Sequence, residues 1–289
     1  MSKKFTKITL KESFLKRYPK YNIVLKRWEE ATNTQCTFDN ITAYNLKLFC
    51  DYLISMMSRN GAKTYLSMFS SVLSLHADTT HLPYNWKHIL SIKSESSQHT
   101  YLSKKEIKKI YNYIPKSTTE RIIQIQFILG CLTGARKSDY IKFTKSNIQR
   151  HSIIYCSQKT GTSVTVPATK TAVSIINELD SYTEAEKDIS DVHFNDTLRN
   201  ICKSVGIDNT MTLHHHGVTY TQPKYFFISS HTARRSFVTN LYIDDVNLYD
   251  ISKMCGHSNI SITQRYICVG IIIKNKIKKS FSEYDDILK

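Results

Sequence analysis

Histidine and arginine residues occur at short, regular spacings in the second half of this sequence. His231 and Arg234 lie three positions apart, just after Ser229 and Ser230, either of which can cap a helix. A helix would place the two side chains on one face near its N-terminus. An imidazole can exchange a proton near neutral pH and a guanidinium is a permanent bidentate cation, so the pair suits a phosphate group. A buried histidine bonded to the backbone would give the same pattern.

Two more cations occupy positions from which they could contact the same anion. Arg136 follows a glycine break at residues 133–134, where one helix can end and the next begin. Free backbone N–H groups at such a point favour a bound phosphate. Lys159 lies in the turn of residues 158–161, between two β-branched runs, where it could reach into a groove. Taken alone, each of these residues is more commonly a solvated surface cation.

A tyrosine follows a second histidine at a spacing that could place the two together. His257 comes directly after Gly256, and Tyr266 follows nine residues later, across a segment whose pattern predicts a short capped helix. The chain has 18 tyrosines, so only its position relative to His257 distinguishes Tyr266.

These elements, taken in chain order, resemble the tyrosine recombinase (phage integrase) family throughout the second half of the chain. The matching positions are Arg136, Lys159, His231-x-x-Arg234, Gly256-His257 and Tyr266. The stretch from His231 to Tyr266 is most similar to integrases of bacteroidete-type mobile elements. The first hundred residues resemble the helical core-binding domain of this family through their hydrophobic pattern only.

The resemblance implies a DNA strand-breaking and rejoining enzyme. Tyr266 would attack a DNA phosphodiester, form a 3′-phosphotyrosyl link and release a 5′-hydroxyl. The ester energy stays in the protein–DNA bond, so neither ATP nor a metal or other cofactor is implied. Arg136 and Arg234 would clamp the extra negative charge of the transition state.

The resemblance also implies which residues handle protons and which support the site. Lys159 would protonate the leaving 5′-oxygen, and His231 would take part in proton transfer around the phosphate and the tyrosine. His257 would hydrogen-bond a non-bridging oxygen. Asp139 matches the acidic residue that supports the active site in this family, and Arg235 would be a structural or phosphate-contacting neighbour.

Helical periodicity and one hairpin pattern predict the elements that must hold these side chains. We expect an antiparallel hairpin over residues 152–167, with Gly161 in its turn. We expect a Ser103–Glu106 capping box and helices over residues 104–113, 119–132, 171–180, 194–205, 231–243 and 247–255, with one or two more after residue 258. The predicted fold class is mainly α with a small antiparallel β-sheet.

The first hundred residues predict a small helical domain. Helices are expected over residues 14–31, broken or kinked at Pro19, and over 42–57 and 62–77. Between Trp86 and Tyr101 the sequence turns polar and loses periodicity, and residues 94–100 have the composition of a linker. The chain is therefore expected to comprise a helical core-binding (SAM-like) DNA-binding domain, residues 1–97, and a tyrosine recombinase catalytic domain, residues 98–289.

Charge and composition agree with a protein that surrounds double-stranded DNA. The formal charge is +16, of which residues 1–100 contribute +7 and the remainder +9, so both parts are basic. A 41% hydrophobic composition excludes a disordered basic tail. The longest apolar segment, residues 122–135, is too short to span a membrane and predicts a buried helix. The N-terminus lacks the plan of a signal peptide, so we expect a cytoplasmic, nucleoid-associated protein.

Cysteines and histidines give no metal-site pattern. The seven cysteines form no C-x-x-C pair and are expected to be reduced thiols. The consecutive histidines 214–216 cannot all face one ion on a regular element. Residues 271–288 alternate apolar and charged positions like an amphipathic helix, which could dock on a neighbouring protomer or pack in cis. The resemblance implies a homotetramer on two paired sites, with accessory DNA-bending proteins as further candidate partners.

Two alternatives to a site-specific recombinase stay open on the sequence. A type IB topoisomerase-like enzyme would nick and reseal DNA without exchanging partners, and would relax supercoiled DNA without a specific site. A non-catalytic DNA-binding protein of the same fold is the other alternative, although every catalytic position is filled. The sequence leaves open whether recombination integrates, excises or inverts a mobile element.

Overall fold

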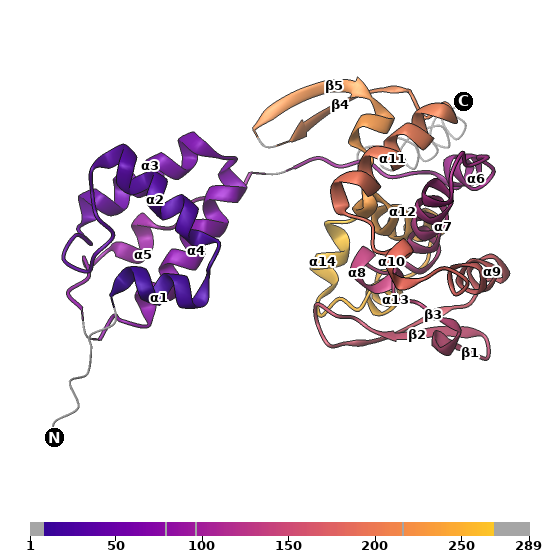
Figure 1. Cartoon of the computed structure of the whole chain (residues 1–289), viewed down its shortest axis with the longest axis horizontal. Helices are drawn as coiled ribbons and strands as arrows, with labels where there is room; N and C mark the ends of the chain where they lie inside the picture. Colours follow the sequence, from indigo (N-terminus) through magenta and orange to yellow (C-terminus); the bar gives the residue numbers. More distant parts are fainter. Residues whose placement is uncertain (1–8, 79, 96, 216, 269–289) are drawn as a thin grey trace, which may run out of the picture. The chain divides into compact units, whose positions relative to one another are not determined.

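The computed structural model describes residues 9–78, 80–95, 97–215 and 217–268, with the side chain of residue 215 left out. The chain divides into two units (Figure 1). The first unit extends to Ser97 and also includes His214–Thr219, and the second begins at Gln98. Within the described residues, no helix is both long and apolar enough to cross a membrane. The predicted amphipathic segment at residues 271–288 and the first eight residues lie outside the described part of the chain.

The first unit is a bundle of short helices around an aromatic core. Its helices are α1 (Leu10–Arg17), α2 (Tyr21–Thr32), α3 (Ala43–Met56), α4 (Arg59–Ser74) and α5 (Trp86–Ile89). Phe69 stacks on Phe14 with ring centroids 4.6 Å apart and packs against Phe49 at 4.8 Å. The chain breaks between α1 and α2 at Pro19, as predicted, because proline cannot continue a helix without losing a hydrogen bond.

The segment after the first bundle is more ordered than its polar sequence suggests. Trp86 and Leu90 are buried in the first core, so helix α5 belongs to that unit and was missed by the sequence pattern. Asn60 then holds both backbone groups of Glu95, at 2.9 and 3.0 Å. A four-residue helix is too short to show periodicity. The sequence pattern therefore predicted that regular structure ends at Trp86, before α5.

The second unit is built around α7 (Thr118–Thr133). Eleven of its 16 residues are buried, as expected for a helix that is apolar all round. The helices α6 (Lys104–Tyr111), α9 (Lys170–Leu179), α11 (Asp191–Ser204) and α12 (Ser230–Ile243) pack against it. Gly134 ends α7 with φ +66°, and a Cβ there would lie 2.4 Å from the ring of Phe237. The predicted buried helix and the Ser103–Glu106 capping box are confirmed.

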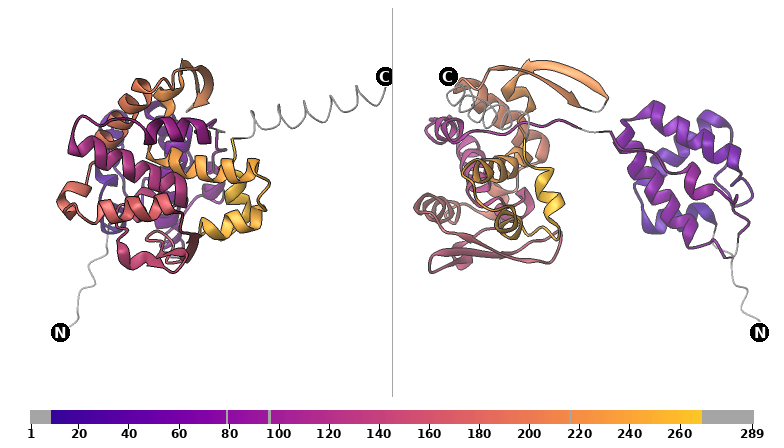
Figure 2. Two further views of the ribbon diagram at one scale, coloured as in Figure 1. Left: turned by 90° about the vertical axis from the view of Figure 1, so that its right-hand side faces the viewer. Right: turned by 180° about the vertical axis from the view of Figure 1, so that it is seen from behind.

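A three-stranded antiparallel sheet in the order β1-β2-β3 covers one end of the second unit (Figures 1 and 2). Its strands are β1 (Ile148–Gln149), β2 (Ser152–Cys156) and β3 (Ser163–Pro167). Ile154 pairs with Thr165, and Gly161 adopts φ +64° in the connecting turn. The predicted hairpin is thus confirmed, and β1 extends it by one strand.

A second, two-stranded sheet was not predicted. It consists of β4 (Thr210–His215) and β5 (Val218–Pro223), and the hydroxyls of Thr212 and Thr221 lie 2.9 Å apart across it. Every residue of β5 up to Gln222 is exposed. Strand β4 alternates the exposed Thr210 and Thr212 with the buried Leu213, but on β5 the apolar Val218 and Tyr220 are as exposed as their polar neighbours. Strand β5 therefore has no buried apolar face of the kind by which a sequence predicts a half-buried strand.

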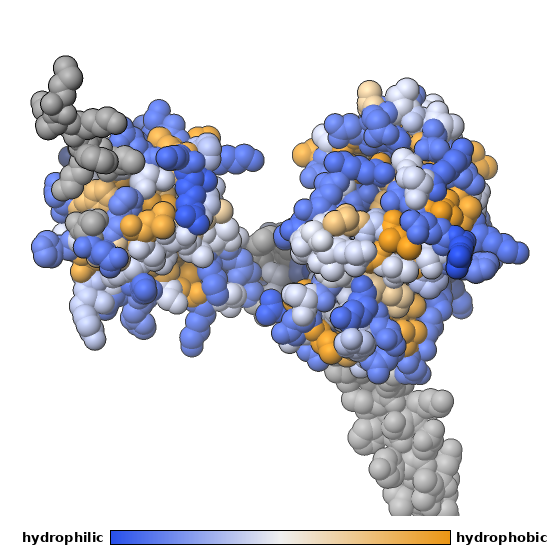
Figure 3. Space-filling view, turned by 90° about the horizontal axis from the view of Figure 1, so that it is seen from below, coloured by the Kyte–Doolittle hydropathy of each residue, from blue (hydrophilic) through white to orange (hydrophobic). Residues whose placement is uncertain are grey.

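Short helical segments complete the second unit. They are α8 (Lys137–Tyr140), η1 (Lys145–Asn147), α10 (Glu184–Lys187), η2 (Lys224–Phe227), α13 (Leu248–Met254) and α14 (Ile260–Gln264). The predicted fold class, mainly α with a small antiparallel sheet, is confirmed. On the face that Figure 3 presents, hydrophilic side chains cover most of each unit and apolar residues form small separate patches.

Candidate active site

Helix α12 presents His231 and Arg234 on one face, as their spacing predicts. Ser229 is the N-cap, and its N–H donates to the hydroxyl of Thr232 at 3.0 Å. Both side chains lie against one aromatic ring. The ring of Tyr266 is centred 5.3 Å from the ring of His231, and Arg234 Cζ lies 5.5 Å from the same ring centre.

Arg234 is a buried cation held by backbone carbonyls. Its side chain is 1% exposed, and its Nη1 donates to the carbonyl of Gly134 at 2.6 Å. Nη2 donates to the carbonyl of Cys255 at 2.5 Å and to His257 Nε2 at 2.7 Å. Gly134 and Cys255 are the C-caps of α7 and α13, so the guanidinium lies at the partly negative ends of two helices.

His257 is buried between Arg234 and α14. Besides the contact of Nε2 with Arg234, its Nδ1 lies 2.9 Å from the hydroxyl of Thr263. Burial, together with the charges of Arg234 and Arg136 and the neighbouring His231, lowers the pKa of His257 to about 3. The imidazole is therefore neutral at physiological pH.

Tyr266 is half-buried with cationic and imidazole groups around its ring. The ring of His257 is centred 5.1 Å away, and Arg235 Cζ lies 5.2 Å from the ring centre. Arg235 also donates to the carbonyl of Arg265 at 3.1 Å. The sequence left open whether Arg235 is structural or contacts phosphate. In this structure its hydrogen bond to the carbonyl of Arg265 links the residue before Tyr266 to α12.

A buried network links Arg136 to the hairpin that carries Lys159. Arg136 is the N-cap of α8, and its Nη1 donates to the hydroxyl of Ser157 at 2.8 Å. Asp139 is 3% exposed and accepts from the Ser157 hydroxyl at 3.3 Å and from the N–H of Gln158 at 2.9 Å. Asp139 therefore anchors the start of the turn formed by residues 158–161, in agreement with a supporting role.

Lys159 is exposed in that turn, and its charge acts on His231. The histidine keeps an edge open to solvent, while neighbouring protein atoms shield the rest of its ring from water. This desolvation lowers the pKa of His231 to about 4, and four cations contribute to the same shift: Arg235, Arg234, Arg136 and Lys159. His231 is thus a neutral imidazole at physiological pH.

The structure therefore brings four of the six predicted residues, His231, Arg234, His257 and Tyr266, into contact in the second unit. Tyr266 contacts His231, His257 and Arg234 directly, and the charges of Arg136 and Lys159 act on His231. Sequence reasoning missed two buried hydroxyls that contact the predicted residues, those of Ser157 and Thr263. Serine and threonine are common throughout the chain, so no spacing distinguished these two.

No group of three histidine, cysteine or acidic side chains that could hold a metal ion occurs in the described part of the chain. Residue 216 and the side chain of residue 215 lie outside it. His214 approaches the hydroxyl of Thr219 at 3.3 Å.

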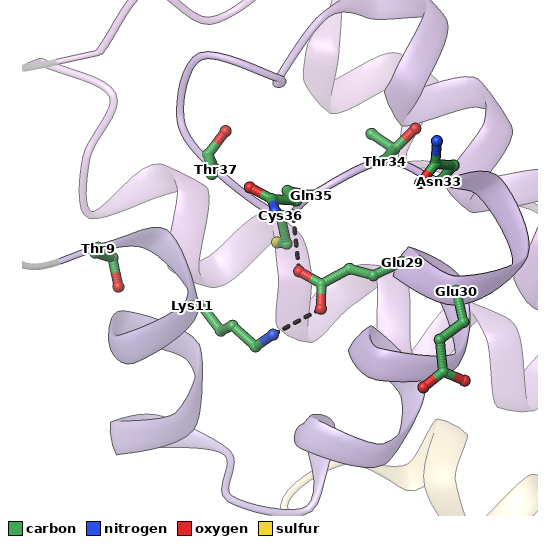
Figure 4. A pocket seen from close by; sticks show the side chains of 9 residues that line it. All are labelled: Thr9, Lys11, Glu29, Glu30, Asn33, Thr34, Gln35, Cys36 and Thr37. Atoms are coloured by element: carbon green, nitrogen blue, oxygen red, sulfur yellow. Dashed lines mark hydrogen bonds and ion pairs between the residues drawn. The ribbon is translucent and has the colours of Figure 1, made fainter.

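A surface pocket of about 540 Å³ lies in the first unit (Figure 4). Glu29 accepts from Lys11 at 2.6 Å and from the N–H of Cys36 at 2.9 Å. Burial and the charge of Glu29 raise the pKa of the Cys36 thiol to about 12, so it stays protonated. Lys11, Glu29 and the backbone of Cys36 are thus bonded to one another at this pocket, and they link α1, α2 and the segment after α2 within the first unit.

The phage integrase family model matches residues 100–270, which is more than half of the chain. The chain belongs to the phage integrase family. A curated relative is the tyrosine recombinase XerA of Thermococcus kodakarensis, which is 25% identical over 172 residues, 59% of this chain and 58% of that protein. The chain thus matches just over half the length of that relative.

Solved structures of phage integrase family proteins share the fold. A lambda integrase tetramer bound to a Holliday junction aligns with a TM-score of 0.60 at 16% identity, covering 91% of this chain and 78% of that chain. The Tn1549 transposon integrase in complex with a circular intermediate DNA aligns with a TM-score of 0.63 at 14% identity, covering 90% and 95%. At these identities the likeness establishes the fold.

Proposed function

We propose that this phage integrase family protein is a site-specific DNA recombinase that cleaves and rejoins strands through a 3′-phosphotyrosyl intermediate. One observation carries the proposal: the ring of Tyr266 is centred 5.1–5.5 Å from His257, His231 and the guanidinium of Arg234. The match to the family model over residues 100–270 supports it. XerA, the curated relative, is named a tyrosine recombinase.

The nucleophile must lose a proton as it attacks. A phenol has an ordinary pKa of about 10, so it is mostly neutral at physiological pH and needs a base. His231 is neutral there, lies against Tyr266 and can accept the phenol proton. The tyrosine oxygen then bonds to phosphorus while the bond from phosphorus to the 5′-oxygen breaks.

The leaving oxygen and the transition-state charge require cations. Lys159 is assigned to give its proton to the 5′-oxygen, since its turn is anchored by Asp139 and its charge acts on the same histidine. Arg136 and Arg234 are assigned to the non-bridging oxygens. Loss of one such preorganised donor typically slows catalysis by about 10²–10³. A later attack by a 5′-hydroxyl on the phosphotyrosyl bond rejoins a strand and restores Tyr266.

Double-stranded DNA is the proposed substrate, and two paired sites held by a homotetramer are the proposed assembly. The charge of +16 favours binding to a polyanion, and lambda integrase has been solved as a tetramer on a Holliday junction. The first unit is proposed to be the core-binding domain. The likeness of residues 231–266 to bacteroidete-type integrases supports a mobile element as the DNA that is integrated, excised or inverted, with the protein residing at the nucleoid.

Covalent capture tests this function. Suicide duplexes from the DNA that flanks the gene should form a protein–DNA adduct with the wild-type protein and none with Tyr266→Phe. The adduct is separated on a denaturing gel, and melting curves of both proteins serve as the folding control. An undiminished adduct with Tyr266→Phe would refute the assignment of the nucleophile. Absence of any adduct with wild type on every flanking site would favour a non-catalytic DNA-binding protein.

A second assay separates recombination from topoisomerase-like activity. A recombinase should leave a supercoiled plasmid without a target site unchanged and should exchange strands only between two target sites. Relaxation of the plasmid that lacks a site, lost with Tyr266→Phe, would instead identify a nicking and resealing enzyme.

A further inference from the structure

Ser157 is a buried serine at the base of the turn that carries Lys159. It directly follows the last residue of β2 and is 1% exposed. Its N–H donates to the carbonyl of Thr162 at 2.9 Å, and its carbonyl accepts the N–H of Gly161 at 2.8 Å. The backbone of Ser157 therefore closes the turn. None of the spacings that identify the predicted site residues includes it.

The hydroxyl of Ser157 lies between two charged groups. It is 2.8 Å from Nη1 of Arg136 and 3.3 Å from Oδ2 of Asp139. A guanidinium can only donate and a carboxylate can only accept, so the direction of both hydrogen bonds is fixed. The hydroxyl accepts from Arg136 and gives its own proton to Asp139. Ser157 thus bridges a cation and an anion.

This bridge ties Arg136 to a carboxylate that is itself fixed. Asp139 is 3% exposed, and its Oδ1 accepts the N–H of Gln158 at 2.9 Å. Within the described residues, the side chains of Arg136 and Asp139 are joined through the hydroxyl of Ser157 and form no direct ion pair. Removal of that hydroxyl would therefore separate the guanidinium from the carboxylate and from the turn.

The contact with Ser157 leaves part of the guanidinium for DNA. Arg136 is half-buried, and among the described residues only its Nη1 has a protein acceptor. A guanidinium carries five N–H donors in one plane. A bond at Nη1 therefore helps to set that plane, while Nε and Nη2 stay available to the oxygens of a phosphate.

We propose that Ser157 is a positioning residue that orients the guanidinium of Arg136 and ties it to the base of the turn that carries Lys159. The catalytic consequence rests on the recombinase function, whereas the contact itself does not. The hydroxyl holds the residue that is assigned to the phosphate, and the backbone closes the turn of the residue that is assigned to the leaving oxygen. Ser157 acts through these two residues.

Two substitutions test the hydroxyl. Ser157→Ala removes it, whereas Ser157→Cys keeps the shape of the side chain and supplies a thiol, which is a weak donor and acceptor. Ser252→Ala is the matched control, because Ser252 is also a buried serine of the second unit and its hydroxyl donates to the carbonyl of Tyr249 in its own helix at 2.7 Å. Melting curves show whether each variant is folded. Ser157→Cys replaces Ser157→Ala in the assays if the alanine variant is unfolded.

The contact can be measured without DNA. Arginine side chains are labelled with ¹⁵N in the full-length protein, and the signals of Arg136 are assigned with Arg136→Lys. A guanidinium that is held at Nη1 rotates slowly about its Nε–Cζ bond, so the two Nη groups should give separate signals in wild type and in Ser252→Ala. Ser157→Ala should show averaged Nη signals. Averaged signals in the wild-type protein, or separate signals in Ser157→Ala, would overturn the proposal.

Cleavage shows whether the contact serves the reaction. Loss of a group that orients an active-site side chain typically costs about 10–100-fold in activity. Ser157→Ala should slow adduct formation on a suicide duplex by that factor, and Ser252→Ala should keep the wild-type rate. Many phosphate contacts share the binding of a duplex, so the affinity of Ser157→Ala for it should stay close to that of wild type. An unchanged cleavage rate in Ser157→Ala would refute the positioning role.

A double-mutant cycle shows whether Ser157 acts through Arg136. If it does, Ser157→Ala should slow cleavage much less in the Arg136→Ala background than in the wild-type background, because the group that it orients is already absent. A merely structural role for Ser157 would slow cleavage by the same factor in both backgrounds. Such additive effects would refute the assignment to Arg136.

The readouts also separate this proposal from the proposed function. Suppose that the Arg136 signals change in Ser157→Ala as expected, but that the wild-type protein forms no adduct with any flanking duplex. The recombinase function would then be wrong, while Ser157 would still hold Arg136. Adduct formation by wild type, together with identical Arg136 signals in wild type and Ser157→Ala, would instead refute the positioning proposal alone.

Discussion

Arg234 keeps a full positive charge in the interior of the second unit. An unpaired buried charge is costly, and here two helix C-terminal carbonyls and one imidazole accept from Nη1 and Nη2, while Nε is buried with no partner among the described residues. A lysine at this position would keep the charge but lose the planar fork that reaches three acceptors. The residue is thus fixed by the same contacts that hold the ends of α7 and α13.

The two site histidines make stability depend on pH. Burial and nearby cations lower the pKa of His231 to about 4 and that of His257 to about 3, from an ordinary 6.5. Between pH 6.5 and 4 the unfolded chain binds protons that the folded protein does not. The free energy of unfolding should therefore decrease as pH falls through this window.

Urea unfolding at pH 7.5, 6 and 5 measures this effect. The wild-type protein should lose more stability over this range than His257→Gln or His231→Gln, because each variant removes one of the linked groups. Carboxylates contribute equally to the pH dependence of stability in all three proteins. The difference in pH dependence between wild type and each variant therefore reports on the substituted histidine. Identical pH dependence in the three proteins would contradict the lowered pKa values.

At the scale of elements, α12 is the part of the fold on which the site depends most. It carries His231 and Arg234, and Thr239 on the same helix donates to the carbonyl of Tyr266 at 3.3 Å. Ser236 and Asn240 of the same helix bind the backbone of Leu102, at 2.8 and 2.9 Å. The helix therefore holds both Tyr266 and the segment by which the chain enters the second unit.

The glycine that ends α7 should be less tolerant of a side chain than the glycine in the β2–β3 turn. Gly134 and Gly161 have φ values of +66° and +64°, so Gly→Ala adds similar backbone strain, about 1 kcal/mol, at both. At Gly134 a Cβ would also lie 2.4 Å from Phe237, whereas nothing lies within 4 Å at Gly161.

Gly134→Ala should therefore cost about 1–3 kcal/mol more in unfolding free energy than Gly161→Ala. Urea denaturation of both variants and wild type measures the difference. Adding Phe237→Leu to Gly134→Ala should recover part of the loss. Equal destabilisation by the two alanine substitutions would show that the Phe237 ring can move away from the added Cβ with no loss of unfolding free energy.

The elements that the sequence predicted share a strong local signal. Helix α7 is a long apolar run with a cap at each end, α12 follows a serine cap, and the β2–β3 hairpin has β-branched runs around a glycine turn. Helix α5 and strands β4 and β5 were missed, because four residues cannot show a period and the apolar residues of β5 are exposed instead of packed in the core. The six candidate site residues were predicted from their order and spacing along the chain. Ser157 and Thr263 act through contacts made only in three dimensions, so no pattern in the chain could identify them.

At the scale of the whole molecule, positive charge is spread over both parts of the chain. Each phosphate contact displaces condensed counterions, so the logarithm of the DNA-binding constant falls with the logarithm of salt concentration by about 0.9 per contact. A duplex held by six or more contacts should bind at least about 10³-fold more weakly in 200 mM salt than in 50 mM. Fluorescence anisotropy with a labelled duplex measures the slope. Nearly constant affinity would contradict a DNA-surrounding role for the +16 charge.

The hydrogen bond between Thr239 of α12 and the carbonyl of Tyr266 also predicts how mixtures of two inactive variants should behave. Because Tyr266, the proposed nucleophile, has its ring centre 5.5 Å from Arg234 Cζ of its own chain, we expect each protomer to hold a complete set of catalytic groups. A mixture of Tyr266→Phe and Arg234→Ala chains contains no protomer with both residues intact. Adduct formation by the mixture should therefore stay at the low level of the separate variants, and recovery on mixing would show that chains share their active sites.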